Sequence, residues 1–132
     1  MPTIAFLLAF LAQMDPVGWY FTVNYPIKQQ SPIIAGGAAY GGYATWSPNQ
    51  ITIDTPSIFA SGMSYQDNVA WAACLLTHEA AHIRHRTAYH EVPLAMQYVC
   101  LDRAGAPPTL KNHVYEQMQR EIIPPSSDGG AE

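Results

Sequence analysis

The sequence predicts an α+β fold. Apolar residues recur at helical spacing through most of the second half of the 132-residue chain, whereas two stretches of the first half combine aromatic and β-branched residues, as strands do. A chain of this length is long enough for one hydrophobic core and too short for two. We therefore expect one domain over residues 1–122, followed by a flexible, polar C-terminal tail over residues 123–132.

The first half is expected to contain a helix, a strand and a hairpin. The mostly apolar residues 3–14 predict a helix that ends before Asp15-Pro16, because a proline disfavours helical dihedrals in the residue that precedes it. Aromatic and β-branched residues over 19–25 predict a strand, and residues 26–32 predict a loop that begins near one proline and ends at another. Residues 43–54 predict a β-hairpin, because two runs with strand character flank a short polar turn that contains proline.

The apolar residues 4–12 are expected to pack inside the domain. They are too short to span a bilayer, which takes about 20 residues. They also lack the features of a signal peptide, since no Lys or Arg precedes them and Phe10 stands where a small residue should precede a cleavage after Ala12. We therefore expect no transmembrane segment and favour the cytoplasm over export, with the compartment otherwise open.

Three helices are expected in the second half, over about residues 65–86, 91–105 and 109–122. Ser64 and Asp67 have the spacing of a capping box, which starts the first of them. Pro93 is tolerated only in the first turn of a helix, so the second helix must begin just before it. Gly105, ahead of two prolines, ends that helix.

The sequence His78-Glu79-Ala80-Ala81-His82 forms an H-E-x-x-H motif inside the first of these helices. Four residues turn an α-helix by about 400°, so the two imidazoles share one face and can reach one metal ion. Glu79 stands at the flank, where it can hold and deprotonate a water bound to that ion. We expect His78 and His82 to bind zinc and Glu79 to act as general base. Several divalent ions suit such donors, so the identity of the ion stays open.

A tetrahedral zinc site of the hydrolytic kind needs a third protein ligand and leaves the fourth position to water. We expect Glu91 to be this ligand, because the chain can fold back between His82 and the next helix. His90 is the nearest alternative. His85 is disfavoured, since it lies about 10 Å along the helix axis from His78.

Two further residues of the site have candidates but no assignment: the partner that orients a histidine and the donor that stabilises the transition state. The partner that orients an imidazole is expected to be Asp102 or a backbone carbonyl. The residue that stabilises negative charge in the transition state is sought among three side chains that can donate a hydrogen bond, namely Tyr89, His113 and Tyr115.

Residues 77–82, Thr-His-Glu-Ala-Ala-His, resemble the active-site helix of the zincin metallopeptidases, and residues 91–105 resemble the glutamate helix of their gluzincin branch. The resemblance implies a minimal zincin-like domain with a small β-sheet or hairpin, an active-site helix and a glutamate helix. It implies zinc ligands at His78, His82 and Glu91, and a general base at Glu79. The hairpin 43–54 is similar to the zincin edge strand, which holds an extended peptide. The metzincin branch is disfavoured, because this chain has His and Ala at positions 85 and 88, where that branch has Gly and His.

The sequence therefore predicts a zinc-dependent metallopeptidase that hydrolyses peptide or protein substrates. The alternative from another class is a metal-stabilised, non-catalytic binding or assembly module. Only 12% of the residues are charged and the first half is poor in charge, so a second copy of the chain or a partner protein could cover it. A metal-dependent hydrolase of non-peptide substrates is a third possibility.

Composition argues against a nucleic-acid partner, because the net charge is −4 and the six basic residues form no run.

Cys74 and Cys100 both lie in apolar helical stretches. A buried free thiol is the expected state for each of them. The alternatives are that the two cysteines pair with each other or that they help to bind a metal. The redox compartment stays open.

Overall fold

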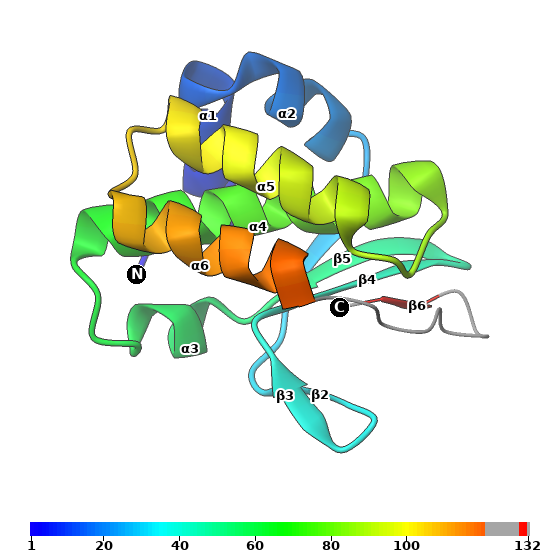
Figure 1. The fold of residues 1–132 in the computed structure, drawn as a ribbon. Coiled ribbons are helices and arrows are strands. Elements are labelled where there is room, and N and C mark those ends of the chain that lie inside the picture. Colours follow the sequence, from blue (N-terminus) through cyan, green and yellow to red (C-terminus); the bar gives the residue numbers. More distant parts are fainter. Residues whose placement is uncertain (121–129, 132) are drawn as a thin grey trace.

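The computed structural model describes residues 1–120 and 130–131, which form a mixed α+β fold (Figure 1). The helices are α1 (Ile4–Met14), α2 (Pro16–Thr22), α3 (Thr55–Phe59), α4 (Tyr65–His85), α5 (Glu91–Arg103) and α6 (Pro108–Arg120). The strands are β1 (Ile27–Gln29), β2 (Ile33–Ala35), β3 (Ala38–Tyr40), β4 (Gly42–Trp46), β5 (Asn49–Ile53) and β6 (Gly130–Ala131). The expected α+β class is confirmed.

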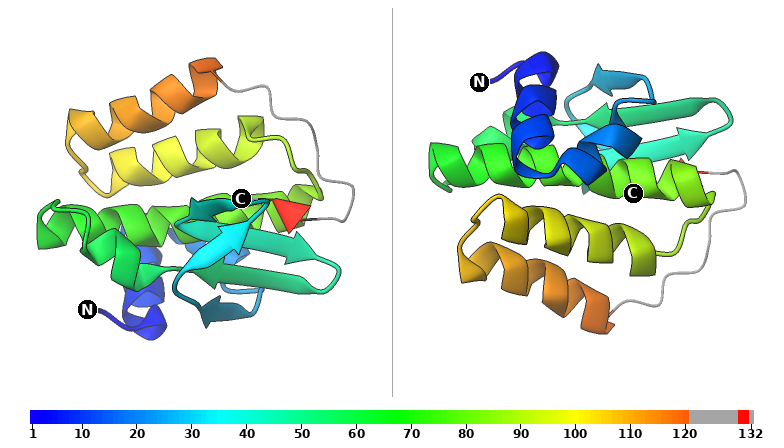
Figure 2. Two further views of the ribbon diagram at one scale, coloured as in Figure 1. Left: turned by 90° about the horizontal axis from the view of Figure 1, so that it is seen from below. Right: turned by 90° about the horizontal axis from the view of Figure 1, so that it is seen from above.

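Helix α4 lies at the centre of the fold. The sheet lies on one side of α4, while α5 and then α6 lie on the opposite side (Figure 2). Helices α1 and α2 pack against a third side of α4, at the top of Figure 1. Because neighbours surround it, every residue of α4 from Ala72 to Ile83 is buried, including the polar residues of the H-E-x-x-H motif.

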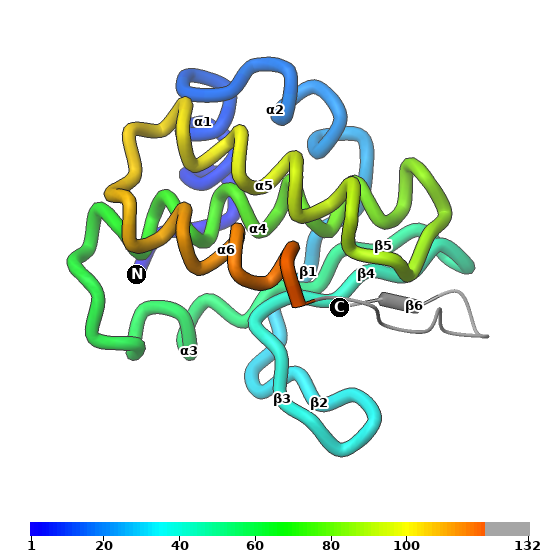
Figure 3. Tube along the Cα trace, in the orientation of Figure 1, coloured from blue at the N-terminus to red at the C-terminus, as the bar shows by residue number. Residues whose placement is uncertain are grey.

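The main sheet has the strand order β1-β5-β4-β6. The expected hairpin is confirmed, since β4 and β5 pair antiparallel from Gly42 opposite Ile53 to Trp46 opposite Asn49. Strand β1 pairs parallel with β5, and β6 pairs antiparallel with the other edge of β4. A second hairpin, β2-β3, extends away from the helices, as the chain trace in Figure 3 shows. Alternation along β4 and β5 places Ala44, Ile51 and Ile53 in the core.

The expected strand over residues 19–25 is wrong, because the chain forms helix α2 there. Asp15 caps this helix by accepting a hydrogen bond from the Gly18 amide, at 3.3 Å, and Pro16 occupies the first turn. Thr22 donates to the Gly18 carbonyl oxygen at 2.7 Å and lies 3.3 Å from the Thr77 hydroxyl. Local capping and packing on α4 therefore override the strand preference of the aromatic residues.

The region before the hairpin needs a second correction. The expected loop over residues 26–32 contains β1, which pairs with β5.

Farther along the chain the expected helix starts are confirmed. The Ser64 hydroxyl accepts from the Asp67 amide at 3.2 Å, so α4 begins at Tyr65, and α5 begins at Glu91 with Pro93 in its first turn.

The last expected helix is confirmed over the residues that the structure describes, where α6 reaches Arg120. Its expected end at residue 122 lies outside the described residues. The expected flexible tail over residues 123–132 also lies outside them, apart from Gly130 and Ala131, which form β6. Among the described residues, none of the helices is both long and apolar enough to cross a membrane.

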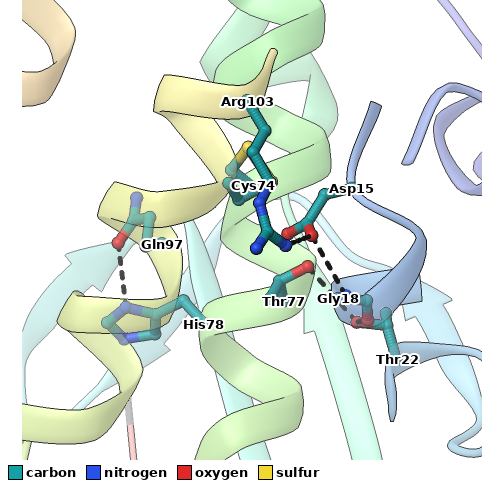
Figure 4. The surroundings of a disulfide bond; sticks show 9 residues. Asp15, Gly18, Thr22, Cys74, Thr77, His78, Gln97 and Arg103 are labelled. Atoms are coloured by element: carbon teal, nitrogen blue, oxygen red, sulfur yellow. Dashed lines mark hydrogen bonds and ion pairs between the residues drawn. A yellow bond between two sulfur atoms is a disulfide. The ribbon is translucent and has the colours of Figure 1, made fainter. Parts of the chain in front are cut away.

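Cys74 and Cys100 form a disulfide bond between α4 and α5, so the expected free thiols are wrong (Figure 4). Their Cα atoms lie 5.5 Å apart, although 26 positions separate them in the sequence. The two residues meet because α5 folds back antiparallel along α4. Closing a loop of this length stabilises a fold by about 3.5 kcal/mol in the chain-entropy account.

Asp54 joins β5 to α3 through three hydrogen bonds. Its carboxylate accepts from the Ser57 amide at 3.1 Å and from the Ser57 hydroxyl at 2.7 Å, and the Ser31 hydroxyl is a further donor. Burial by itself raises the pKa of Asp54, but these hydrogen bonds outweigh it and lower the pKa below its ordinary value of 3.8.

We expect the Asp54→Ala variant to lose about 1 kcal/mol of unfolding free energy near pH 7, as the loss of a helix cap usually costs. The folded-state pKa lies below the unfolded one, so the carboxylate stabilises the fold above about pH 4, and this stabilisation disappears as the pH falls through the folded pKa. Urea unfolding of both proteins near pH 7 and near pH 2.5 measures the effect. An equal difference at both pH values would contradict this account.

Candidate metal centre

Three buried histidines meet beside α4. His78 and His82 stand one turn apart on α4, and His90 is the residue that precedes the first turn of α5. One ring nitrogen from each of the three lies within 4.8 Å of those of the others, and the residues are only 5%, 0% and 7% exposed. Nitrogen ligands of a tetrahedral zinc ion lie about 3.4 Å apart, which follows from Zn–N bonds of about 2.0–2.1 Å. A small adjustment of the rings would therefore place all three nitrogens on one ion.

Hydrogen bonds on the far side of two rings orient their nitrogens. His82 Nδ1 lies 2.7 Å from the Thr87 carbonyl oxygen, and His78 Nδ1 lies 2.9 Å from Gln97 Oε1. Both partners are acceptors, so in the neutral rings each Nδ1 carries the proton and each Nε2 presents a lone pair.

These two lone pairs face one another, because the Nε2 atoms of His78 and His82 are 3.1 Å apart. Two neutral imidazoles in this tautomer repel at such a distance, whereas a cation bound to both would be attracted by both lone pairs. The donor set and its orientation therefore fit a metal ion.

Glu79 is 1% exposed, and its Oε2 atom lies 4.0 Å from His78 Nε2. The backbone of β4 passes directly over this carboxylate, since a Cβ atom at Gly42 would lie 2.7 Å from Glu79 Oε2. Only glycine allows so close an approach. The start of β4 and the H-E-x-x-H motif thus form one side of the same site.

The structure does not bring Glu91, the expected third ligand, to this group. Glu91 is exposed and lines a different cavity together with Asp15 and Arg103. Successive helical residues differ by about 100° in direction, so Glu91 turns away when His90 faces α4. The arrangement favours the alternative, His90. His85 is exposed at the end of α4 and does not belong to the group.

Gln97 is a site residue that the sequence analysis missed. It is 2% exposed, and Figure 4 shows its side chain reaching His78 from α5. A backbone carbonyl, expected as one possible orienting partner, is found at Thr87. The other candidate, Asp102, lies far along α5 and pairs with Lys111 at 3.1 Å. Gln97 follows His90 by seven positions, the spacing of one helix face, and this pattern was its only sequence indication.

A cavity of about 260 Å³ opens beside Glu79. It is lined by residues of α4, α5, α6 and the β3–β4 connection: Tyr40, Gly41, Gly42, Trp71, Leu75, His78, Glu79, His90, Leu94, Gln97 and Gln117. None of the expected transition-state donors lines it. Tyr89 and Tyr115 are 51% and 52% exposed, and the exposed His113 contacts the Trp71 ring. Tyr40 is the tyrosine of the cavity, and it was missed because its surroundings are rich in glycine.

The Gln97→Leu variant is expected to bind zinc about 10–100-fold more weakly, as the loss of an orienting partner usually costs. Leucine removes the acceptor of His78 Nδ1 while roughly keeping the volume. Gln97→Glu keeps an acceptor at that position and should retain or increase the affinity. Competition with a chromophoric chelator measures the dissociation constants, and melting of the metal-free variants checks their folds. Equal affinities of the Leu and Glu variants would show that Gln97 does not orient His78.

The fold and the site define a class of protein: a mixed α+β domain with a candidate three-histidine metal centre and an adjacent buried carboxylate. Comparisons with protein-family models, with curated proteins and with solved structures found no match to this chain. The functional proposal below therefore rests on the residues and their geometry.

Proposed function

We propose that this protein is a zinc-dependent metallopeptidase with a minimal zincin-like domain, in which His78, His82 and His90 hold the ion. The observation that carries the proposal is the Glu79 carboxylate, 4.0 Å from the Nε2 atom of His78, at the edge of a group of three histidine nitrogens that lie within 4.8 Å of one another. A general base next to an open coordination position is the arrangement that metal-assisted hydrolysis needs.

When bound, the zinc ion would lower the pKa of its water ligand and polarise the scissile carbonyl group. Glu79 would accept a proton from water at its carboxylate and later pass it to the leaving amine. Its burial beneath β4 keeps bulk water from competing for the proton. Gln97 and the Thr87 carbonyl keep the two motif histidines in the tautomer that presents Nε2.

A peptide is the substrate that the surroundings of the site favour. Strand β4 starts beside Glu79, and its edge away from β5 pairs antiparallel with β6 at Ala44 and Thr45, so a peptide held along this edge would take the place of β6. A substrate bound as an added strand would gain backbone hydrogen bonds irrespective of its sequence. A cavity of about 260 Å³ adjoins the Glu79 carboxylate and offers room for a side chain of such a peptide.

The test is an unbiased peptide library digested by the zinc-loaded protein and read by mass spectrometry. We expect cleavage that stops when a chelator removes the ion and returns when zinc is added back. Full activity in the presence of an effective chelator, or no cleavage at all by the zinc-loaded protein, would contradict the proposal.

A metal-stabilised, non-catalytic module is the second candidate, and one observation favours it. Val17, Tyr20 and Val23 are 55%, 61% and 43% exposed on or next to α2, which leaves an apolar surface for a partner. In this case removal of zinc would lower the melting temperature or disperse an oligomer, with no turnover at any stage. The library digestion, run with melting and size measurements on the same samples, separates the two candidates.

A further inference from the structure

We propose that the cavity beside Glu79 is a specificity pocket for one uncharged, apolar side chain of the peptide, and that Gln117 is a specificity-determining residue of it. The inference rests on the proposed peptidase function and names the class of substrate that the site selects. It assigns a role to α6, which contributes no residue to the candidate metal centre.

The described walls of the cavity are mostly uncharged. Trp71, Leu75 and Leu94 supply apolar surface, and Gln97 and Gln117 supply neutral amides. Among the described residues that line it, there is no Lys, Arg or Asp, and Glu79 is the one carboxylate. An acidic side chain that entered would lose its hydration and face the Glu79 carboxylate, and a basic one could pair only with Glu79, which the proposed reaction uses as its base. An apolar side chain would leave water for an apolar wall.

The cavity lies where a side chain next to the scissile bond of a bound peptide would enter it. Gly41 and Gly42 line it, and a Cβ atom at Gly42 would lie 3.2 Å from Leu75, so the backbone at the start of β4 forms one wall. A peptide that took the place of β6 and continued along β4 to Gly42 would therefore pass the cavity at Glu79. The residue whose side chain enters is one that adjoins the scissile bond.

Gln117 is the residue through which this preference can be changed. It is half-buried on α6 and belongs neither to the histidine group nor to the residues that orient it. The preceding turn anchors the helix, because Val114 is buried in the core and His113 contacts the Trp71 ring. A substitution at Gln117 therefore alters the charge of the cavity without removing a contact of the metal centre.

The experiment compares cleavage-site profiles of wild type, Gln117→Lys and Gln117→Glu on the same peptide library. Wild type should prefer an uncharged, apolar residue at one position next to the cleaved bond. The Lys variant should shift that position towards Asp and Glu, and the Glu variant towards Lys and Arg, each by about tenfold or more in relative cleavage. Gln119→Lys, an exposed change on the same helix outside the cavity, should keep the wild-type profile.

The outcomes separate this inference from the proposed function. Cleavage with unchanged profiles in both charged variants overturns the specificity pocket and leaves the peptidase standing. No cleavage by zinc-loaded wild type overturns both. Zinc affinity and melting temperature, measured for each variant, show whether the fold is kept. Gln117→Ala adds a variant without charge. It should enlarge the cavity and shift the preference towards bulkier apolar side chains. An unaltered cleavage profile of this variant also counts against the proposal.

Discussion

Glu79→Gln is expected to lower the kcat/KM of peptide hydrolysis by about 10²–10⁴-fold, the usual contribution of a general base. The amide has nearly the shape of the carboxylate, so the close contact with Gly42 persists, but it cannot take a proton from water. The histidine nitrogens are untouched, and zinc affinity should therefore stay near that of wild type. The rates are measured on a peptide that the library screen shows to be cleaved.

Glu116→Gln provides the matched control, because Glu116 is exposed on α6 and lies outside both the histidine group and the cavity. It should hydrolyse the same peptide at the wild-type rate. Undiminished cleavage by Glu79→Gln would remove Glu79 from the mechanism. A loss of zinc in that variant would instead make Glu79 a part of the coordination sphere.

The second large effect is expected for the third ligand. His90→Ala should weaken zinc binding by more than the 10–100-fold that loss of an orienting partner costs, because a donor atom itself disappears. Peptide hydrolysis should fall with it. Glu91→Ala should change neither quantity, since Glu91 is exposed and faces a different cavity.

Competition titrations with a chelator, performed on both variants and on wild type, decide between the two ligand sets. A large loss of affinity in Glu91→Ala together with wild-type binding in His90→Ala would restore the two-histidine, one-glutamate site that the gluzincin resemblance implies. Because the two residues are adjacent, any general disturbance of the start of α5 affects both variants, and only a difference between them is informative.

The features that could be predicted from the sequence depend on neighbours within about one helical turn. Ser64 and Asp67 start α4 through a contact three residues apart, and Pro93 limits where α5 can begin. The sharing of one helix face by His78 and His82 follows from helical geometry alone. The expected strand over residues 19–25 was wrong because the cap of Asp15 and the packing of α2 on α4 outweigh a preference for strand.

The sequence by itself thus determined the helix that carries the H-E-x-x-H motif, its two histidines, the adjacent carboxylate and the neighbouring hairpin. Tertiary structure alone decided which residues of α5 face that helix. The rotation of α5 about its own axis turns His90 and Gln97 towards His78 and leaves Glu91 outside, and the antiparallel packing of α4 and α5 joins Cys74 to Cys100. The physical reason is that such a rotation is set by the side chains packed between the two helices, which no spacing along one chain segment specifies.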